Sequence, residues 1–133
     1  MKLTTRSEYA LLALVHLARH GEGKLVPLSR IAAAQKIPAK YLEQLATAMC
    51  RAGYLTSAKG SRGGYALARP AGKITLAEVI RLFDGALAPD SAVSRYFYRS
   101  TPIEREKKLV SLMKGIRDHI AGKLENTTIG NMV

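Results

Sequence analysis

Three consecutive segments with helical spacing of apolar residues, each ended by glycine or proline, constrain the fold of this chain most strongly. Residues 5–20 repeat apolar side chains every three or four positions, after a threonine suited to capping, and HGEG at 20–23 ends this segment. Pro27 opens a second, shorter segment. KIPAK at 36–40 forms a turn, because its proline has no N–H to continue a helix, and a third segment then runs to Gly53. The pattern predicts three helices, the last two joined by a tight turn.

Two short runs with strand-like alternation follow the third segment, YLTS at 54–57 and YALA at 65–68. The piece between them is rich in glycine and basic residues, so we expect a β-hairpin with a mobile tip. Helix, helix, turn, helix and hairpin in this order predict a mainly α fold, a winged helix–turn–helix with a two-stranded β-wing.

The remainder of the chain reads as two more helices separated by an irregular stretch. Thr75 and Glu78 have the spacing of a capping box, which predicts a helix through Asp84. A long helix is expected over 103–124, and its apolar stripe cannot bury itself, so we interpret it as a dimerisation helix. The final TTIGNMV is expected to cap that helix or to pack on a partner.

These spacings divide the chain into three parts. We predict a winged helix–turn–helix DNA-binding domain over 1–85, a loop over 86–102, and the dimerisation helix and tail over 103–133.

Basic residues are concentrated in the N-terminal half. The chain carries a formal net charge of +11, with 12 Lys/Arg against 3 Asp/Glu up to residue 73, and 9 against 7 after it. A basic half joined to a nearly balanced half indicates a polyanion-binding part with a second part of another role. The single cysteine, Cys50, allows no intramolecular disulfide, and no stretch approaches the ~18 apolar residues of a membrane span. We therefore expect a cytoplasmic protein that does not enter the membrane.

The glycine-rich tip has two functional interpretations. A P-loop or a dinucleotide-binding turn would open a helix, whereas GSRGG is followed by a strand, which disfavours a nucleotide cradle. A basic wing is favoured, because glycine lets backbone N–H groups approach phosphates closely. Its candidate DNA-binding residues are Lys59, Gly60 and Arg62. A plain hairpin turn remains the alternative.

The third segment begins AKYLEQL and has the composition of a recognition helix. Leu42 and Leu45 are expected to face the core. The outward candidates for DNA contact are Lys40, Tyr41, Glu43 and Gln44. Gln can pair with adenine, Lys can reach guanine or phosphate, and Glu can accept from cytosine. An ordinary solvated helix face is the alternative.

Other reactive residues give weaker patterns. Cys50 is expected to be a small buried residue rather than a redox thiol, and His16 and His20 lack the partners that a zinc site needs. No nucleophile, base or carboxylate pair forms a catalytic constellation, so no enzyme is expected. RYFYRS at 95–100 is interpreted as a latch for the loop or a dimer contact. A second DNA contact and a ligand pocket stay open as alternatives.

Four stretches of the chain resemble the Rrf-two (Rrf2) family of bacterial transcription regulators. They are MKLTTRSEYALLALVHLA, VPLSRIAAAQKIPAKYLEQL, GYLTSAKGSRGGYALARP and ITLAEVIRLFDG, and the combination of YLEQL with RGGY at this spacing is specific. The resemblance is strong over residues 1–85 and weaker through the tail.

The resemblance implies a homodimeric regulator that binds double-stranded DNA sequence-specifically, and we expect a repressor. It places the helix from Lys40 in the major groove, with Tyr41 and Gln44 reading or positioning and Glu43 discriminating between bases. It also places the tip residues Lys59, Gly60 and Arg62 at the adjacent minor groove. Many members carry arginine where Lys59 stands, which predicts a weaker contact there.

Cluster-binding members of the family carry three cysteines in the loop after the fourth helix. Ala92 and Ser100 stand where two of those cysteines are expected, and neither side chain replaces a thiolate ligand. We therefore expect no cofactor and no metal site in this sequence. An iron–sulfur cluster would require that the natural loop over 86–102 contains cysteines that this sequence lacks.

The same departure motivates a second functional hypothesis. One branch of the family, which represses cysteine metabolism, works with a protein partner. This chain could likewise be a regulatory protein-interaction module controlled by a metabolic enzyme, with DNA contact secondary.

Overall fold

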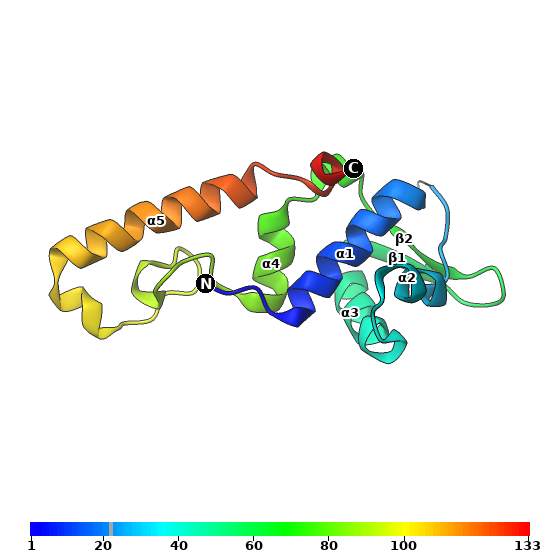
Figure 1. Cartoon of the computed structure of the whole chain (residues 1–133), viewed down its shortest axis with the longest axis horizontal. Helices are drawn as coiled ribbons and strands as arrows, with labels where there is room; N and C mark the ends of the chain where they lie inside the picture. The colour runs from blue at the N-terminus through cyan, green and yellow to red at the C-terminus, as the bar shows by residue number, and fades with distance from the viewer. Residues whose placement is uncertain (22) are drawn as a thin grey trace.

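A computed structural model describes residues 1–21 and 23–133, so Glu22 of the HGEG stop lies outside the described residues. The helices and strands are, in chain order, α1 (Thr5–His20), α2 (Leu28–Gln35), α3 (Ala39–Arg51), β1 (Leu55–Ala58), β2 (Gly64–Leu67), α4 (Leu76–Asp84) and α5 (Lys107–Glu125). Short 3-10 helices lie between and after them: η1 (Ala71–Lys73), η2 (Ser91–Val93), η3 (Pro102–Arg105) and η4 (Ile129–Met132). Figure 1 shows the wing and α5 projecting toward opposite ends of the molecule. The predicted winged helix–turn–helix is confirmed.

The three N-terminal helices close around one aliphatic core. Thr4 caps α1 by accepting from the Ser7 N–H, and the Gly21 N–H donates to the Leu17 carbonyl at its other end. The largest fully buried side chains here are Leu14, Leu17, Leu42, Leu45 and Met49. Because these residues recur at helical spacing, their burial fixes which faces of α1 and α3 turn outward.

The turn between α2 and α3 depends on an unusual backbone conformation. Lys36 is left-handed, with φ 55°, and the next N–H, of Ile37, donates to the Ala32 carbonyl at 2.9 Å. This ends α2 and lets α3 begin after Pro38 in a new direction.

The wing is a two-stranded antiparallel hairpin with an isolated β-bridge beside it. β1 pairs with β2 in a register that sets Leu55 opposite Leu67 and Ala58 opposite Gly64. Val26 and Tyr65 exchange backbone hydrogen bonds of 2.8 and 2.9 Å, which ties the hairpin to the segment that leads into α2. The wing is therefore anchored at its base to the helix–turn–helix.

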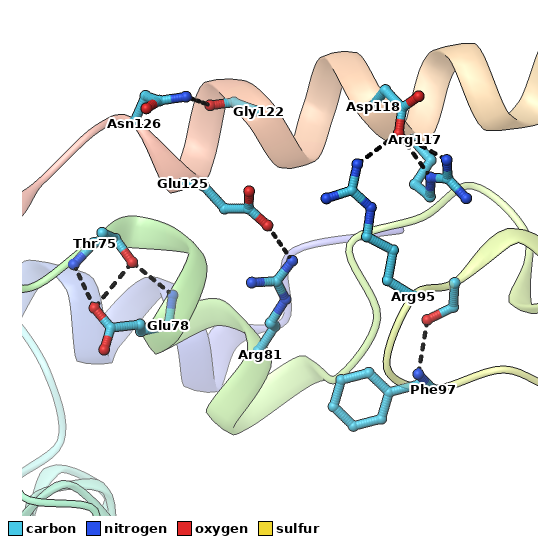
Figure 2. Close-up of polar contacts among 11 residues, drawn as sticks. Thr75, Glu78, Arg81, Arg95, Phe97, Arg117, Asp118, Gly122, Glu125 and Asn126 are labelled. Carbon is cyan, nitrogen blue, oxygen red and sulfur yellow. Dashed lines mark hydrogen bonds and ion pairs between the residues drawn. The ribbon is translucent and has the colours of Figure 1, made fainter.

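The capping box predicted for α4 is present. The Thr75 hydroxyl accepts from the Glu78 N–H at 3.1 Å, and the Glu78 carboxylate accepts from the Thr75 N–H at 2.9 Å (Figure 2). Arg69 also reaches Glu78 at 3.3 Å and lies over the Tyr54 ring at 4.5 Å from its centroid. These contacts hold the end of the wing against α4.

The long C-terminal helix begins later than its apolar spacing predicts. Residues 102–105 form η3, and α5 runs from Lys107 to Glu125 rather than from Ile103 to Leu124. The physical reason is a separate tight turn that Pro102 opens, since proline suits the first turn of a helix. The Glu106 N–H bonds back three residues to the Ile103 carbonyl, so the α-helical pattern starts only after it.

The tail contributes to the end of α5, as one sequence-based alternative predicts, because the Thr127 hydroxyl donates to the Lys123 carbonyl at 2.7 Å. The rest of the tail also packs back on the N-terminal helices, which neither alternative predicted. The Leu76 N–H donates to the Thr127 carbonyl at 2.9 Å, and the Ile129 N–H donates to the Ile74 carbonyl at 2.8 Å. Ile129 is fully buried in the core of the N-terminal helices, and the Cβ of an alanine at position 130 would meet the Gly72 backbone at 3.1 Å. The chain therefore leaves the helix–turn–helix after α4 and returns to it at η4.

None of the helices in the described part of the chain is long and apolar enough to cross a lipid bilayer.

Candidate nucleic-acid interface

One face of α3 is polar and exposed because its opposite face supplies the core. Leu42, Leu45, Ala46 and Met49 are buried, which leaves Lys40, Glu43 and Gln44 exposed in the first turns as the sequence predicts. The backbone N–H groups at the start of α3 have no side-chain cap and no acidic residue in the first turn. An uncapped helix start with Lys40 beside it offers positive potential to an anion.

Tyr41 differs from its neighbours on α3. Its ring is half-buried and meets the Tyr9 ring of α1 edge-on, with centroids 5.7 Å apart and an interplanar angle of 80°. This packing restricts the ring to one orientation, so any DNA contact by Tyr41 would be made by a side chain already positioned by α1.

The tip of the wing carries Lys59, Gly60 and Arg62, and all three are exposed. Gly60 has φ +102° with open space around it, so its glycine serves the backbone conformation of the tip. The Gly63 N–H closes the tip by donating to the Gly60 carbonyl at 3.0 Å. The tip thus presents two cations on a short loop that the Gly60–Gly63 hydrogen bond and the β1–β2 pairing hold in place.

The other two glycines of the motif have an architectural role. A Cβ at Gly63 would lie 2.2 Å from the Ala58 carbonyl oxygen, and one at Gly64 would lie 2.3 Å from the Val26 carbonyl oxygen. Gly64 also has φ +143°. The glycine-rich character therefore arises mainly from close backbone packing in the wing and at its bridge to Val26.

Two further exposed polar residues, one on α3 and one on α2, were not singled out from the sequence. Thr47 is exposed on α3 one turn after Glu43, and its hydroxyl donates to the Glu43 carbonyl at 2.9 Å. Arg30 is exposed near the start of α2. Helical spacing from Gln44 would have pointed to Thr47, whereas Arg30 becomes apparent only when α2 is placed beside α3.

Acidic partners are absent from this face in the residues that the structure describes. The ion pairs among the described residues lie elsewhere in the molecule. They join Arg69 to Glu78, Arg81 to Glu125, and both Arg95 and Arg117 to Asp118. The cations of α2, α3 and the wing tip take part in none of these pairs. We use the name basic face for the exposed cations Arg30, Lys40, Lys59 and Arg62 of α2, α3 and the wing tip, together with the exposed Gln44 and Thr47 of α3.

Comparison with known proteins gives this geometry a context. A family model described as Rrf2, an iron-dependent transcriptional regulator, matches residues 3–133. The chain belongs to the Rrf2 family.

Individual relatives agree with this assignment. The chain is 43% identical over 89 residues to the protein rrf2 of Nitratidesulfovibrio vulgaris, a match that covers 67% of this chain and 59% of that protein. It is 32% identical to the HTH-type transcriptional regulator IscR of Cronobacter sakazakii, over 100% of this chain and 80% of IscR. The solved structure of CymR, the global cysteine regulator of B. subtilis, superposes with a TM-score of 0.78 at 31% identity, covering 99% of this chain and 95% of CymR.

These relatives confirm the resemblance stated from the sequence. The Rrf2 relatives are helix–turn–helix transcriptional regulators, which supports DNA-binding transcription regulation and confirms that this chain belongs with regulators rather than enzymes.

The residues of this chain do not fit the iron–sulfur cluster that the family resemblance brings to mind. Cys50, the single cysteine, is half-exposed on α3 and packs against the N-terminal core, in a different part of the chain from the loop. Ala92 lies half-buried in η2, and the exposed Ser100 hydroxyl donates to Glu104 at 2.9 Å. Within the described residues no three His, Cys, Asp or Glu side chains converge as metal ligands. Since thiolates hold such clusters, the loop has no suitable donor set.

The histidine pair is part of the packing between α1 and α2. His16 is buried, its ring lies 4.8 Å from that of His20, and its Nδ1 is 3.3 Å from the Gln35 amide nitrogen. Burial, followed by the nearby charge of His20, lowers the pKa of His16 below its usual value. The ring is therefore neutral at physiological pH, as a packed histidine is expected to be.

Proposed function

We propose that this Rrf2-family protein is a sequence-specific DNA-binding repressor that acts as a homodimer in the cytoplasm. The observation that carries the proposal is the basic face, on which exposed cations without acidic partners flank an exposed Gln44 at the start of α3. Cations without partners can exchange their counterions for phosphates, which supplies affinity without sequence preference.

Sequence preference would come from the first two turns of α3 in the major groove. Gln44 is an exposed amide with the reach to pair with adenine, and the neighbouring Glu43 would reject phosphate and accept from cytosine. Lys40 and the uncapped helix start would contact phosphate or guanine. Lys59, Gly60 and Arg62 would lie at the adjacent minor groove, because the wing base is tied to the segment that enters α2.

Dimerisation would be mediated by α5. Its apolar side chains remain exposed in the single chain, with Leu109 at 43%, Leu112 at 57% and Ile116 at 38%. α1 offers a complementary apolar groove lined by Leu11, Leu12, Val15, Leu76 and Met132. A second copy would cover these faces and set two recognition helices in a two-fold arrangement, which suits a palindromic operator.

Repression is the mode of regulation that we propose for this arrangement. Occupying an operator would then act by excluding other proteins from the DNA.

In vitro selection from random duplex DNA, at near-physiological salt, tests this function. We expect a palindrome whose half-sites are separated by about one helical turn or a small multiple. Sedimentation equilibrium of wild type and Leu112→Glu tests the dimer in parallel, with dissociation expected for the variant. Recovery of no motif, with binding that vanishes as salt rises, would contradict sequence-specific regulation.

The exposed aromatic residues Tyr96, Phe97 and Tyr98 favour a second candidate, a regulatory module that binds a metabolic enzyme. Purification of bound proteins with and without nuclease separates the two candidates. An enzyme retained after nuclease treatment, and lost in Tyr98→Ala, would favour the interaction module.

A further inference from the structure

The loop over residues 86–102 is closed at its base by Asp90. The Asp90 carboxylate accepts from the Thr101 hydroxyl at 2.6 Å and from the Ala92 N–H at 2.9 Å, and it thereby caps η2. Beside this contact, the Arg99 N–H donates to the Ser91 carbonyl at 3.1 Å. The two ends of the loop are thus joined next to Ala92 and Ser100, where the family resemblance leads one to expect cysteines.

A second set of contacts fastens the loop to α5 (Figure 2). Arg117 donates to the Val93 carbonyl at 2.9 Å. Figure 2 shows its second contact, with the Asp118 carboxylate at 2.8 Å. Asp118 also pairs with Arg95 of the loop at 3.0 Å. Arg117 is largely buried although it is charged, with 17% of its side chain exposed, so its contact with the Val93 carbonyl satisfies a group that would be costly to leave unpaired.

The aromatic segment completes the attachment on the side of α4. The Phe97 N–H donates to the Ser94 hydroxyl at 3.0 Å, and the Arg81 guanidinium lies 4.8 Å from the centroid of the Tyr96 ring. Arg81 simultaneously pairs with Glu125 of α5 at 2.6 Å (Figure 2). RYFYRS is thus joined to α4 through Tyr96 and to α5 through Arg95, while its backbone bonds to the loop itself and its aromatic rings stay exposed.

We name the side chains of Asp90, Thr101, Arg95, Arg117 and Asp118 the loop clasp. We propose that the loop clasp holds the 86–102 loop in one conformation through protein contacts alone, and that the protein therefore binds its operator without iron. The first half stands on the contacts above; the second half rests on the proposed DNA-binding function. The clasp takes the place that cluster ligands hold in other members of the family. A loop without a cluster needs other contacts to offset the conformational entropy that it loses when it is ordered.

The charge states of the two carboxylates are consistent with a clasp at neutral pH. The hydrogen bonds from Thr101 and Ala92 lower the pKa of Asp90, and those from Arg117 and Arg95 lower the pKa of Asp118. Both groups are therefore acceptors throughout the physiological range.

Hydrogen exchange of the full chain without DNA tests whether the loop clasp holds the 86–102 loop in one conformation. Arg117→Gln and Asp118→Asn are compared with Lys114→Gln, an exposed residue one turn earlier on α5 that loses the same charge as Arg117→Gln. We expect the amides of residues 93–99 to exchange about tenfold faster or more in both clasp variants and at the wild-type rate in the control. Asp118 is 52% exposed, so its substitution should not unfold the protein. Unchanged exchange in both clasp variants would overturn the clasp.

Anaerobic incubation with ferrous iron, sulfide and thiol tests whether the protein binds its operator without iron. Chelator-treated protein and protein incubated in this way are each titrated with the selected operator duplex. We expect Kd values that agree within about twofold and no iron retained after desalting. Retained iron with a tenfold or larger change in Kd would overturn cofactor independence. Absence of any selected operator would instead count against the proposed function, and the exchange result would still decide the clasp.

Discussion

The basic face and the loop clasp use the same residue types for opposite purposes. Among the described residues, the cations of α2, α3 and the wing tip meet no carboxylate, whereas Arg81, Arg95 and Arg117 are each joined to Glu125 or Asp118. Most acidic side chains of the C-terminal half accept hydrogen bonds from neighbours within the fold. Net charge alone therefore does not locate the proposed DNA-binding surface, and exposed cations of α5 such as Lys107 and Lys114 also lack an ion pair among the described residues. The proposal rests on unpaired cations together with their place on α3 and the wing.

The two regions also differ in how they are held. The wing is fixed by backbone packing at Gly63 and Gly64, while the 86–102 loop is fixed by side chains that reach across 11 to 24 positions of sequence. Substitutions in the wing should therefore be detected as a loss of unfolding stability, and substitutions in the loop as faster hydrogen exchange.

The largest effect is expected from Gly64→Ala. The new Cβ would meet the Val26 carbonyl oxygen at 2.3 Å in a residue whose φ is +143°, so the Val26–Tyr65 bridge and the wing base should separate. We expect a loss of about 3 kcal/mol or more in the free energy of unfolding, measured by urea denaturation. Gly72→Ala is the matched control, since its Cβ would meet nothing within 4 Å. Equal stability of the two variants would show that the glycines do not build the wing.

Gln44→Ala tests whether the basic face reads bases as well as phosphates. We expect a loss of about 1–3 kcal/mol in binding to the selected operator, with relaxed preference at one base pair in each half-site. Competition binding against a panel of single-base operator variants measures both. Equal weakening on every sequence, scrambled duplex included, would exclude base reading by this side chain.

Asp84 joins the end of α4 to the start of α1 and gives stability a defined pH dependence. Burial would raise the pKa of its carboxyl, but hydrogen bonds from Ser7 and Thr4 outweigh it and hold the pKa below its usual value. A depressed folded-state pKa means that the stabilisation is complete above the unfolded value near 4 and is lost as pH falls through the folded value.

Thermal unfolding of wild type and Asp84→Asn between pH 7 and pH 3 checks this dependence. At pH 7 the wild type should be more stable by about 1–3 kcal/mol, because it keeps hydrogen bonds to a charged group. The difference should narrow as the pH falls below about 4. A difference that stays constant with pH would mean that the charge of Asp84 is not involved.

Arg81→Gln should have the smallest effect of these substitutions. It removes the 2.6 Å ion pair with Glu125 and the contact over the Tyr96 ring. The Arg81 side chain is 21% exposed and that of Glu125 is 34% exposed. We expect about 1 kcal/mol of lost stability and unchanged operator affinity. A double-mutant cycle with Glu125→Gln isolates the pair, and Arg105→Gln, exposed in η3, provides the control. A tenfold loss of DNA affinity would place Arg81 in the DNA-binding surface.

The sequence predicted the helices and the wing because their signals are local. Helical spacing in α3, the Thr75–Glu78 capping box and the strand-like runs around the glycines each lie within one element. The outward positions of Lys40, Glu43 and Gln44 followed from the burial of Leu42 and Leu45. Contacts made over long stretches of chain were beyond reach, including the return of Ile129 to the core and the Arg117–Val93 bond. No spacing rule relates such residues, because the fold alone brings them together.

The salt dependence of operator binding tests the contrast between the two regions most directly. Two double variants remove the same charge, Lys59→Gln with Arg62→Gln on the wing and Arg81→Gln with Arg95→Gln near the loop. We predict that the slope of log Kd against log salt falls by about one to two in magnitude for the wing variant and stays at the wild-type value for the other. Equal slopes for the two variants would contradict the claim that the unpaired cations of the basic face are the ones that bind DNA.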